Sequence, residues 1–183
     1  MSEWWESLDG HLDRAWSTLS RGVADRRAPA RHLTLATIAQ DGAPALRTVV
    51  LRGARRSDAV LEVHTDARSA KVAELRLDPR AAVHIWDPKA RFQIRLSSRV
   101  EIVMGDAGAW ASVPPRARAV YGEGPPPGAP VPEPVPQRGE GDQAAFTRLL
   151  LHLDRIETLH LGEDMHRRAA FLAPDWAGGW IAP

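Results

Sequence analysis

The feature that most constrains the fold is a succession of short, alternating apolar segments separated by turn signals. Between residues 32 and 104 these strand-like segments follow one another, and a single helix pattern interrupts them. Asp41-Gly42 separates the first two, and an Asp-Gly pair favours a tight hairpin. Without regular strand–helix alternation, the pattern favours an antiparallel sheet over a doubly wound parallel one. Closure into a barrel is expected, because it removes the exposed edges of six or more antiparallel strands.

The expected elements can be placed along one domain of 183 residues. A helix over about residues 2–20 has Ser2 as its N-cap, Ser69 caps a second helix ending at Asp78-Pro79, and Asp106 caps a short helix through Ser112. A further short helix is expected around Arg116–Tyr121, and residues 122–141 form a Pro-rich loop. The expected strands are His32–Thr37, Ala45–Arg52, Val60–Thr65, Ala81–Trp86, a hairpin of Arg91–Leu96 and Arg99–Met104, then Phe146–His152, Glu157–Leu161 and Arg167–Leu172.

The composition excludes several classes of function. A formal net charge of +1 gives no global field toward nucleic acid or an anionic membrane, so neither is an expected partner. The absence of cysteine excludes disulfides, thiolate catalysis and Cys-ligated metal sites. His152, His160 and His166 lack tight ligand spacing, so no metal site is expected. No apolar run reaches membrane-spanning length and no signal peptide is evident, which predicts a cytoplasmic protein.

A group of phosphate-binding side chains is expected where the second and third strands meet the following helix. Arg47 begins an apolar strand segment, Thr65 ends the next strand, and Ser69 and Lys71 open the helix. A guanidinium, an ammonium, two hydroxyls and a helix N-terminus together suit a phosphate group. Lysine is rare here, since the 24 basic residues include only Lys71 and Lys89, so a lysine in this group is informative. The sequence therefore predicts a pocket for a phosphorylated cofactor.

Four fragments, in order, resemble one known family. They are LATIAQDGAPALRTVVLR, VHTDARSAKVAELRLDPRAAVHIW, RFQIRLSSRVEI, and a C-terminal stretch containing DMHRRAAF and DWAGGWIAP. Together they are similar to the pyridoxamine 5'-phosphate oxidase-like FMN-binding split-barrel family. The resemblance implies a mainly β fold with flanking helices, an antiparallel split β-barrel, with FMN as cofactor. It also implies a homodimer with the flavin in a cleft between two subunits.

The resemblance further implies individual positions. The RTVVLR segment is similar to the stretch that wraps the flavin, and His64-Thr65 to a Tyr-Thr pair at the end of the next strand. The glutamine of FQIR matches one near the flavin. His166 matches a histidine on the substrate side of the oxidases, which makes it the catalytic candidate that the resemblance implies. The implied cofactor-binding residues are Arg47, Thr48, Val49, Val50, Leu51, Arg52, His64, Thr65, Arg68, Ser69, Lys71, Gln93, Trp176 and Trp180.

Departures from the family pattern fall mainly on the substrate side. Ala70 stands where the oxidases carry an arginine, and Arg68 restores that charge from the other side of Ser69. Asp164 replaces an arginine for the substrate phosphate and would repel pyridoxamine phosphate. Arg52 replaces a substrate-contacting lysine, and Trp180 replaces an FMN-contacting arginine. We therefore expect a relative of the oxidase that acts as an FMN-dependent oxidoreductase on an unidentified small molecule.

Several alternatives stay open from the sequence alone. The chain could be the true pyridoxamine/pyridoxine 5'-phosphate oxidase, or a non-catalytic protein that binds or senses FMN or heme. An oligonucleotide-binding barrel is a weaker alternative, since one Tyr and three Phe leave few stacking platforms. Arg52 could pair with Asp58 or Glu62, Ser69 could be only a helix cap, and the basic stretch over residues 22–31 could be a solvated linker.

Overall fold

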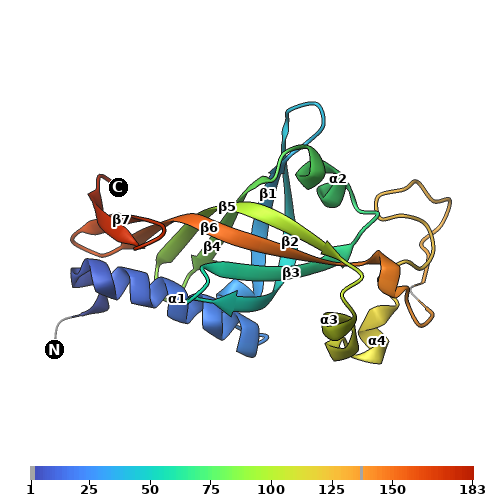
Figure 1. The fold of residues 1–183 in the computed structure, drawn as a ribbon. Coiled ribbons are helices and arrows are strands. Elements are labelled where there is room, and N and C mark those ends of the chain that lie inside the picture. Colours follow the sequence, from blue (N-terminus) through green and yellow to red (C-terminus); the bar gives the residue numbers. More distant parts are fainter. Residues whose placement is uncertain (1–2, 137) are drawn as a thin grey trace.

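The computed structural model describes residues 3–136 and 138–183. Eight antiparallel strands form one sheet in the order β3-β2-β1-β4-β5-β6-β7-β8. Because β3 also pairs with β6, the first six strands close into a barrel, and β7 and β8 extend beyond it (Figure 1). The strands are β1 (His32–Ile38), β2 (Pro44–Arg55), β3 (Val60–Asp66), β4 (Arg80–Asp87), β5 (Phe92–Met104), β6 (Phe146–Leu161), β7 (His166–Leu172) and β8 (Ala177–Ile181).

Helices flank the barrel at different places. The longest, α1 (Leu8–Ala24), runs along one side and reaches under β7, whereas α3 and α4 lie at the opposite end of the molecule (Figure 1). The other helices are α2 (Ala70–Leu77), α3 (Ala107–Ser112), α4 (Pro115–Arg118) and the 3-10 turns Trp4–Glu6, Pro29–Arg31 and Gln143–Ala145. Among the described residues, none of the helices is long and apolar enough to cross a membrane.

The alternation of side chains explains why these segments close into a barrel. Successive residues of a strand point to opposite faces, so Leu33 and Leu35 of β1 lie inside while Thr34 and Ala36 face outward. The same alternation holds along β4 and through the first half of β5. The inward residues and the apolar face of α1, including Leu12, Trp16 and Leu19, form one continuous hydrophobic core. Removing this apolar surface from water is the main stabilising contribution to the fold.

The sequence predicted two pairs of separate strands where the structure has two long, continuous strands. That part of the prediction is wrong. The expected hairpin of Arg91–Leu96 and Arg99–Met104 is the continuous strand β5, because alternation carries on through Ser97-Ser98 and no turn residue interrupts it. The expected strands Phe146–His152 and Glu157–Leu161 are joined in β6 by a bulge, where Ser97 pairs with Arg155 and Ser98 with Leu153. A bulge inserts Asp154 without ending the strand.

The helix boundaries also differ from those expected. Helix α1 begins at Leu8, where Ser7 accepts a hydrogen bond from the Gly10 amide at 3.1 Å. The expected cap at Ser2 lies outside the described residues. Asp106 caps α3 as predicted and accepts from the Ala109 amide at 2.8 Å, whereas the helix expected over Arg116–Tyr121 is the four-residue α4.

Candidate functional site

The residues predicted to hold a phosphate come together at the N-terminus of α2. Ser69 occupies the N-cap position of this helix, as predicted. Its hydroxyl lies 3.2 Å from the Thr65 hydroxyl at the end of β3, and Lys71 Nζ donates to the same Thr65 oxygen at 3.0 Å. Thr65 and Ser69 are buried and Lys71 is half-buried. Together with Arg47 we call these residues the α2 cluster.

Arg47 of β2 also lies near the N-terminus of α2, and it binds Glu74, a partner that the sequence did not reveal. Its Nη2 donates to Glu74 Oε2 of α2 at 2.7 Å, and its Nη1 donates to Thr37 Oγ1 of β1. Thr37 also donates to Glu74, at 2.5 Å. Glu74 is 7% exposed, so its carboxylate is a buried countercharge to Arg47. A buried glutamate on a short helix leaves no periodic signal that would have identified it.

The electrostatics of the α2 cluster favour an added anion. Burial lowers the pKa of Lys71, and the nearby Arg47 lowers it further, while Glu74 and Asp66 act in the opposite direction. Two cations therefore lie within interaction range of one another in a poorly solvated place. An anion bound between them would favour the charged form of Lys71 and would accept hydrogen bonds from both side chains.

Arg68 points away from the α2 cluster. Its guanidinium donates to Asp66 Oδ2 at 2.9 Å and to the backbone oxygens of Glu123 and Gly124 at 3.2 and 3.0 Å. Asp66 also accepts from the Gly122 amide at 2.8 Å. Arg68 therefore attaches the Pro-rich loop to the barrel, and the structure does not bring it to the other predicted phosphate ligands.

A basic pocket of about 580 Å³ lies beside β2, between the start of β1 and helices α3 and α4. Within the part of the chain that the structure describes, no carboxylate lines it. Arg52 projects into it and makes no hydrogen bond or ion pair with a described residue; Arg55, rather than Arg52, pairs with Asp58 and Glu62. The residues lining this basic pocket are Arg26, Arg31, His32, Val50, Arg52, His64, Ser112, Val113, Pro114, Arg116, Ala117 and Tyr121.

Four arginines give the basic pocket its charge. Arg26 and Arg116 make no hydrogen bond or ion pair with a described residue, and in this respect they resemble Arg52. Arg31 donates to the backbone oxygens of Val23 and Leu51 at 3.1 and 3.3 Å. Burial lowers the pKa of Arg31, and repulsion from Arg52 and Arg26 lowers it further. The interpretation of residues 22–31 as a solvated linker fits the exposed Arg26 but is wrong for Arg31, which is half-buried and bound to two backbone oxygens.

The remaining residues of the RTVVLR segment divide between two faces. Val49 and Leu51 lie in the barrel core, so only their backbone atoms can face a cofactor. Thr48 is exposed on the outer face and Val50 lines the basic pocket. At the pocket's edge, His64 Nε2 lies 2.8 Å from Glu62 Oε1. That hydrogen bond and the nearby Arg148 keep the pKa of Glu62 far below its usual value, although burial opposes them.

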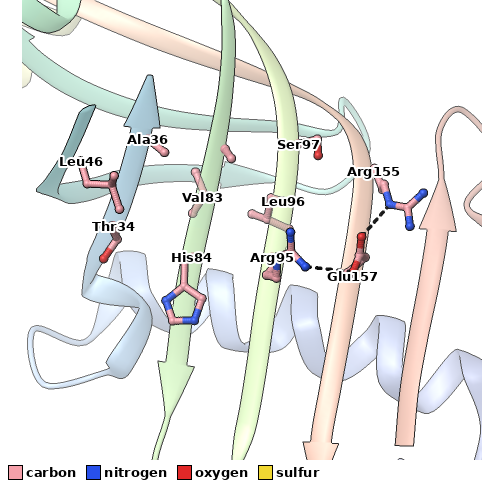
Figure 2. Close-up of a pocket in the computed structure, with 11 residues that line it drawn as sticks. Thr34, Ala36, Leu46, Val83, His84, Arg95, Leu96, Ser97, Arg155 and Glu157 are labelled. Carbon is pink, nitrogen blue, oxygen red and sulfur yellow. Dashed lines mark hydrogen bonds and ion pairs between the residues drawn. The ribbon is translucent and has the colours of Figure 1, made fainter. Parts of the chain in front are cut away.

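The outer face of the sheet is open and carries Gln93. Gln93 Oε1 lies 3.4 Å from His84 Nε2 on the neighbouring strand. Figure 2 shows the adjoining hollow of about 110 Å³, in which Leu46, Thr34 and His84 project from β2, β1 and β4. Beside it, Glu157 accepts from Arg155 at 2.9 Å and from Arg168 at 2.7 Å.

The C-terminal residues predicted to contact a cofactor lie far from the α2 cluster within one chain. Strands β7 and β8 extend beyond the barrel at one end of the molecule, well away from α2 (Figure 1). Trp176 packs on Trp16 of α1 with ring centroids 6.2 Å apart, and Trp180 packs edge-on against His11 at 5.0 Å. His166 is exposed at the start of β7, in a shallow hollow with Trp180.

Comparison with known proteins places this geometry in a family. The sequence profile described as "Pyridoxamine 5'-phosphate oxidase, FMN-binding domain" matches residues 2–104, more than half of the chain. Pyridoxine/pyridoxamine 5'-phosphate oxidase 2 of Arabidopsis thaliana is 31% identical over 91 residues, and the Salinibacter ruber oxidase is 35% identical over 103. Each match covers 48% of this chain and 46% of the relative, so the chain spans about half the length of these curated relatives.

A solved structure matches over nearly the whole chain. It is a pyridoxamine 5'-phosphate oxidase-related, FMN binding protein from Nostoc punctiforme, with a TM-score of 0.76 and 28% sequence identity. The superposition covers 93% of this chain and 96% of that protein, so the barrel and its additions are shared. The profile match and this shared split barrel lead to one conclusion: the chain is a member of the pyridoxamine 5'-phosphate oxidase-like family of FMN-binding split barrels.

Proposed function

We propose that the protein is an FMN-binding flavoprotein that acts as an oxidoreductase on an anionic small molecule. The observation that carries the proposal is the α2 cluster, in which Thr65 contacts both Lys71 and Ser69 and Arg47 lies close by. The cluster has the donors that a phosphate monoester requires, and Lys71 makes no ion pair with a described residue although Arg47 repels it, so a phosphate would supply its missing countercharge. Membership of a family of FMN-binding domains supports FMN as the phosphate carrier.

In this proposal the chain's own residues bind and orient the cofactor. Lys71, Ser69 and Arg47 hold the phosphate at the N-terminus of α2, and the β2 backbone between Thr48 and Arg52 lies along the ring system. Bound FMN would supply hydride transfer, which no side chain of this site can perform. The protein's contribution is to hold the ring beside the substrate and to set the local charge.

The basic pocket is our candidate for the substrate side of the site. It adjoins Val50 and Arg52, and its three unpaired arginines lack a countercharge within the described chain. An anionic substrate would neutralise them, because arginine binds carboxylate and phosphate groups through paired hydrogen bonds. Arg52 is the residue we expect to contact both flavin and substrate.

We further infer that the protein works as a homodimer. Trp176 and Trp180 cannot meet the α2 cluster within one chain, so only a second copy can bring them to a flavin bound there. The outer face of the sheet offers a surface for that copy, since it exposes Leu46, Trp86 and Leu172. A flavin between two subunits is consistent with this arrangement.

The proposal is tested by the absorption spectrum of the purified protein and by mass identification of the molecule that heat releases. Replacing Lys71 with Met keeps the length of the side chain and removes its charge. We expect this variant to bind FMN about tenfold to a hundredfold more weakly, because a charged donor to the phosphate is lost. Lys89→Met, at the only other lysine, is the matched control and should bind FMN normally. Equal affinity in both variants would remove Lys71 from the site.

Pyridoxine/pyridoxamine 5'-phosphate oxidase activity is the second candidate, and the names of the relatives at 31% and 35% identity favour it. Oxygen-dependent formation of pyridoxal phosphate by the FMN-loaded protein would establish it. Asp164, on the exposed connection between β6 and β7, is the residue we expect to disfavour it. Asp164→Arg should then raise the rate with pyridoxamine phosphate, whereas an unchanged rate would place Asp164 outside the substrate site.

A further inference from the structure

A second large pocket lies at the other end of the molecule from α3 and α4. It has a volume of about 620 Å³ and is enclosed by the N-terminal turn, the β4–β5 connection and the β6–β7 connection. Its lining shares no residue with the basic pocket or with the α2 cluster. We call it the tryptophan pocket, after Trp4 and Trp5.

One wall of the tryptophan pocket is aromatic. The Trp5 ring stacks on the His160 ring at 4.9 Å with 23° between the planes, and Trp4 packs edge-on against Trp5 at 5.5 Å. Trp4 also packs edge-on against Phe92 of the core at 4.8 Å, which fixes its position. Trp4 and Trp5 are both half-buried, so part of their flat surface stays available to a ligand. Flat aromatic walls bind flat rings by stacked or edge-on contact.

The rest of the lining includes basic side chains that have no ion-pair partner within the described chain. Lys89 and Arg91, on the β4–β5 connection, make no ion pair with any described residue. Arg167 of β7 makes none either, and within the described chain its side chain hydrogen-bonds only to the Met165 backbone oxygen, at 3.4 Å. Glu163 and Asp164 are also part of the lining, but both are exposed and neither pairs with these cations. The pocket therefore offers several free donors to an acidic group.

Two buried polar atoms in the lining have no hydrogen-bond partner. They are His160 Nδ1 and Arg14 Nε. Both atoms are closed to solvent, and leaving them unpaired costs free energy; a ligand can hydrogen-bond His160 Nδ1 only after the ring has turned toward the pocket. Burial lowers the pKa of His160, and Arg167 and Arg91 lower it further, so its ring is neutral near pH 7. A neutral imidazole nitrogen can donate or accept one hydrogen bond.

We propose that the tryptophan pocket binds a planar aromatic anion at a site distinct from the α2 cluster and the basic pocket. The flat ring packs against Trp5 and Trp4, and the acidic group binds Arg91 and Arg167. His160, once its ring has turned toward the pocket, supplies a polar contact at the edge of the ligand ring. This inference does not depend on the proposed function, because none of the residues that carry it belongs to the α2 cluster or the basic pocket.

Calorimetric titration of the 183-residue chain with 2-naphthoate tests the proposal, in buffer with and without excess FMN. We expect one binding site, present in both buffers, that prefers 2-naphthoate over the uncharged 2-naphthamide. Trp5→Ala and Arg167→Gln should each weaken binding about tenfold or more, as expected for the loss of one stacking or charged contact. Arg56→Gln, an exposed arginine in the β2–β3 turn, is the matched control and should bind normally.

Two results would overturn the proposal. If Arg52→Gln weakened naphthoate binding while Arg167→Gln did not, the anion would be bound in the basic pocket. If naphthoate and naphthamide bound equally, or neither bound, the tryptophan pocket would not recognise an aromatic anion. Loss of FMN binding in any buffer bears only on the proposed function, since the naphthoate titration without FMN stands on its own.

Discussion

At the scale of single residues, the pairing of Arg47 with Glu74 decides how the α2 cluster behaves when it is empty. Arg47 carries both a structural contact to Glu74 at 2.7 Å and the proposed phosphate contact. Glu74→Gln should destabilise the protein by about 2 kcal/mol, because it leaves a half-buried guanidinium without its countercharge. FMN or millimolar phosphate should recover much of this loss by supplying a new anion.

Urea unfolding with and without these anions measures both effects. Glu101→Gln is the control, since the Glu101–His152 pair is exposed on both sides and should contribute little. If Glu74→Gln were destabilised but gained nothing from either anion, Arg47 would be a purely structural residue.

Single residues also show the limit of what the sequence predicted. Ser69 and Lys71 are close in sequence and follow a helix-start pattern, so their position was predictable. The basic pocket was not, because the stretch with Arg26 and Arg31, the strand with Arg52 and the helix with Arg116 are three separate segments that only the folded barrel brings together. Charges that converge over long sequence separation leave no local pattern.

At the scale of elements, helix α1 is attached to the sheet by a buried polar contact. His11 Nδ1 lies 2.8 Å from Thr158 Oγ1 of β6, and the His11 side chain is fully buried. Burial is the main cause that lowers the pKa of His11 to about 4, from 6.5. As the pH falls below 6.5, His11 becomes protonated in the unfolded chain but stays neutral in the folded chain. The free energy of unfolding therefore falls until about pH 4, where His11 is protonated in the folded chain as well.

We expect this one histidine to remove up to about 3 kcal/mol across that window. The measurement is the urea midpoint at several pH values between 4 and 7, for the wild type and for His11→Gln, which should lose this part of the pH dependence. His152→Gln, at an exposed histidine of β6, should keep it. Identical slopes in the wild type and His11→Gln would mean that the buried ring takes up its proton without opening the α1–β6 contact.

Elements were predicted best where turn residues mark their ends. Asp41-Gly42 lies between β1 and β2, and Asp78-Pro79 lies between α2 and β4, as predicted. Strands β5 and β6 were divided wrongly because a polar pair and a bulge look like interruptions in a sequence. Only the pairing of each strand with its neighbours on both sides shows that the ladder continues.

At the scale of the whole molecule, the outer face of the sheet is the surface that we expect a second copy to cover. Leu46 is 65% exposed there, and Leu172 lies on the same face, because paired residues connect the two across β1, β4, β5 and β6. Large exposed apolar side chains gathered on one face mark an interaction surface. The separation of Trp176 and Trp180 from the α2 cluster also requires a partner if they are to contact a flavin.

Leu46→Glu should therefore convert a dimer into a monomer and lower the amount of flavin retained, because a buried charge opposes association and half of the site is lost. Leu77→Glu is the matched control: this leucine is equally exposed, at 69%, but ends α2 and lies outside the sheet face. Light scattering after size-exclusion chromatography gives the mass, and the ratio of visible to ultraviolet absorbance gives the flavin content. A Leu46→Glu dimer with full flavin would place the interface elsewhere. A monomer that keeps its flavin would show instead that the α2 cluster and the β2 backbone bind the cofactor without the partner's tryptophans.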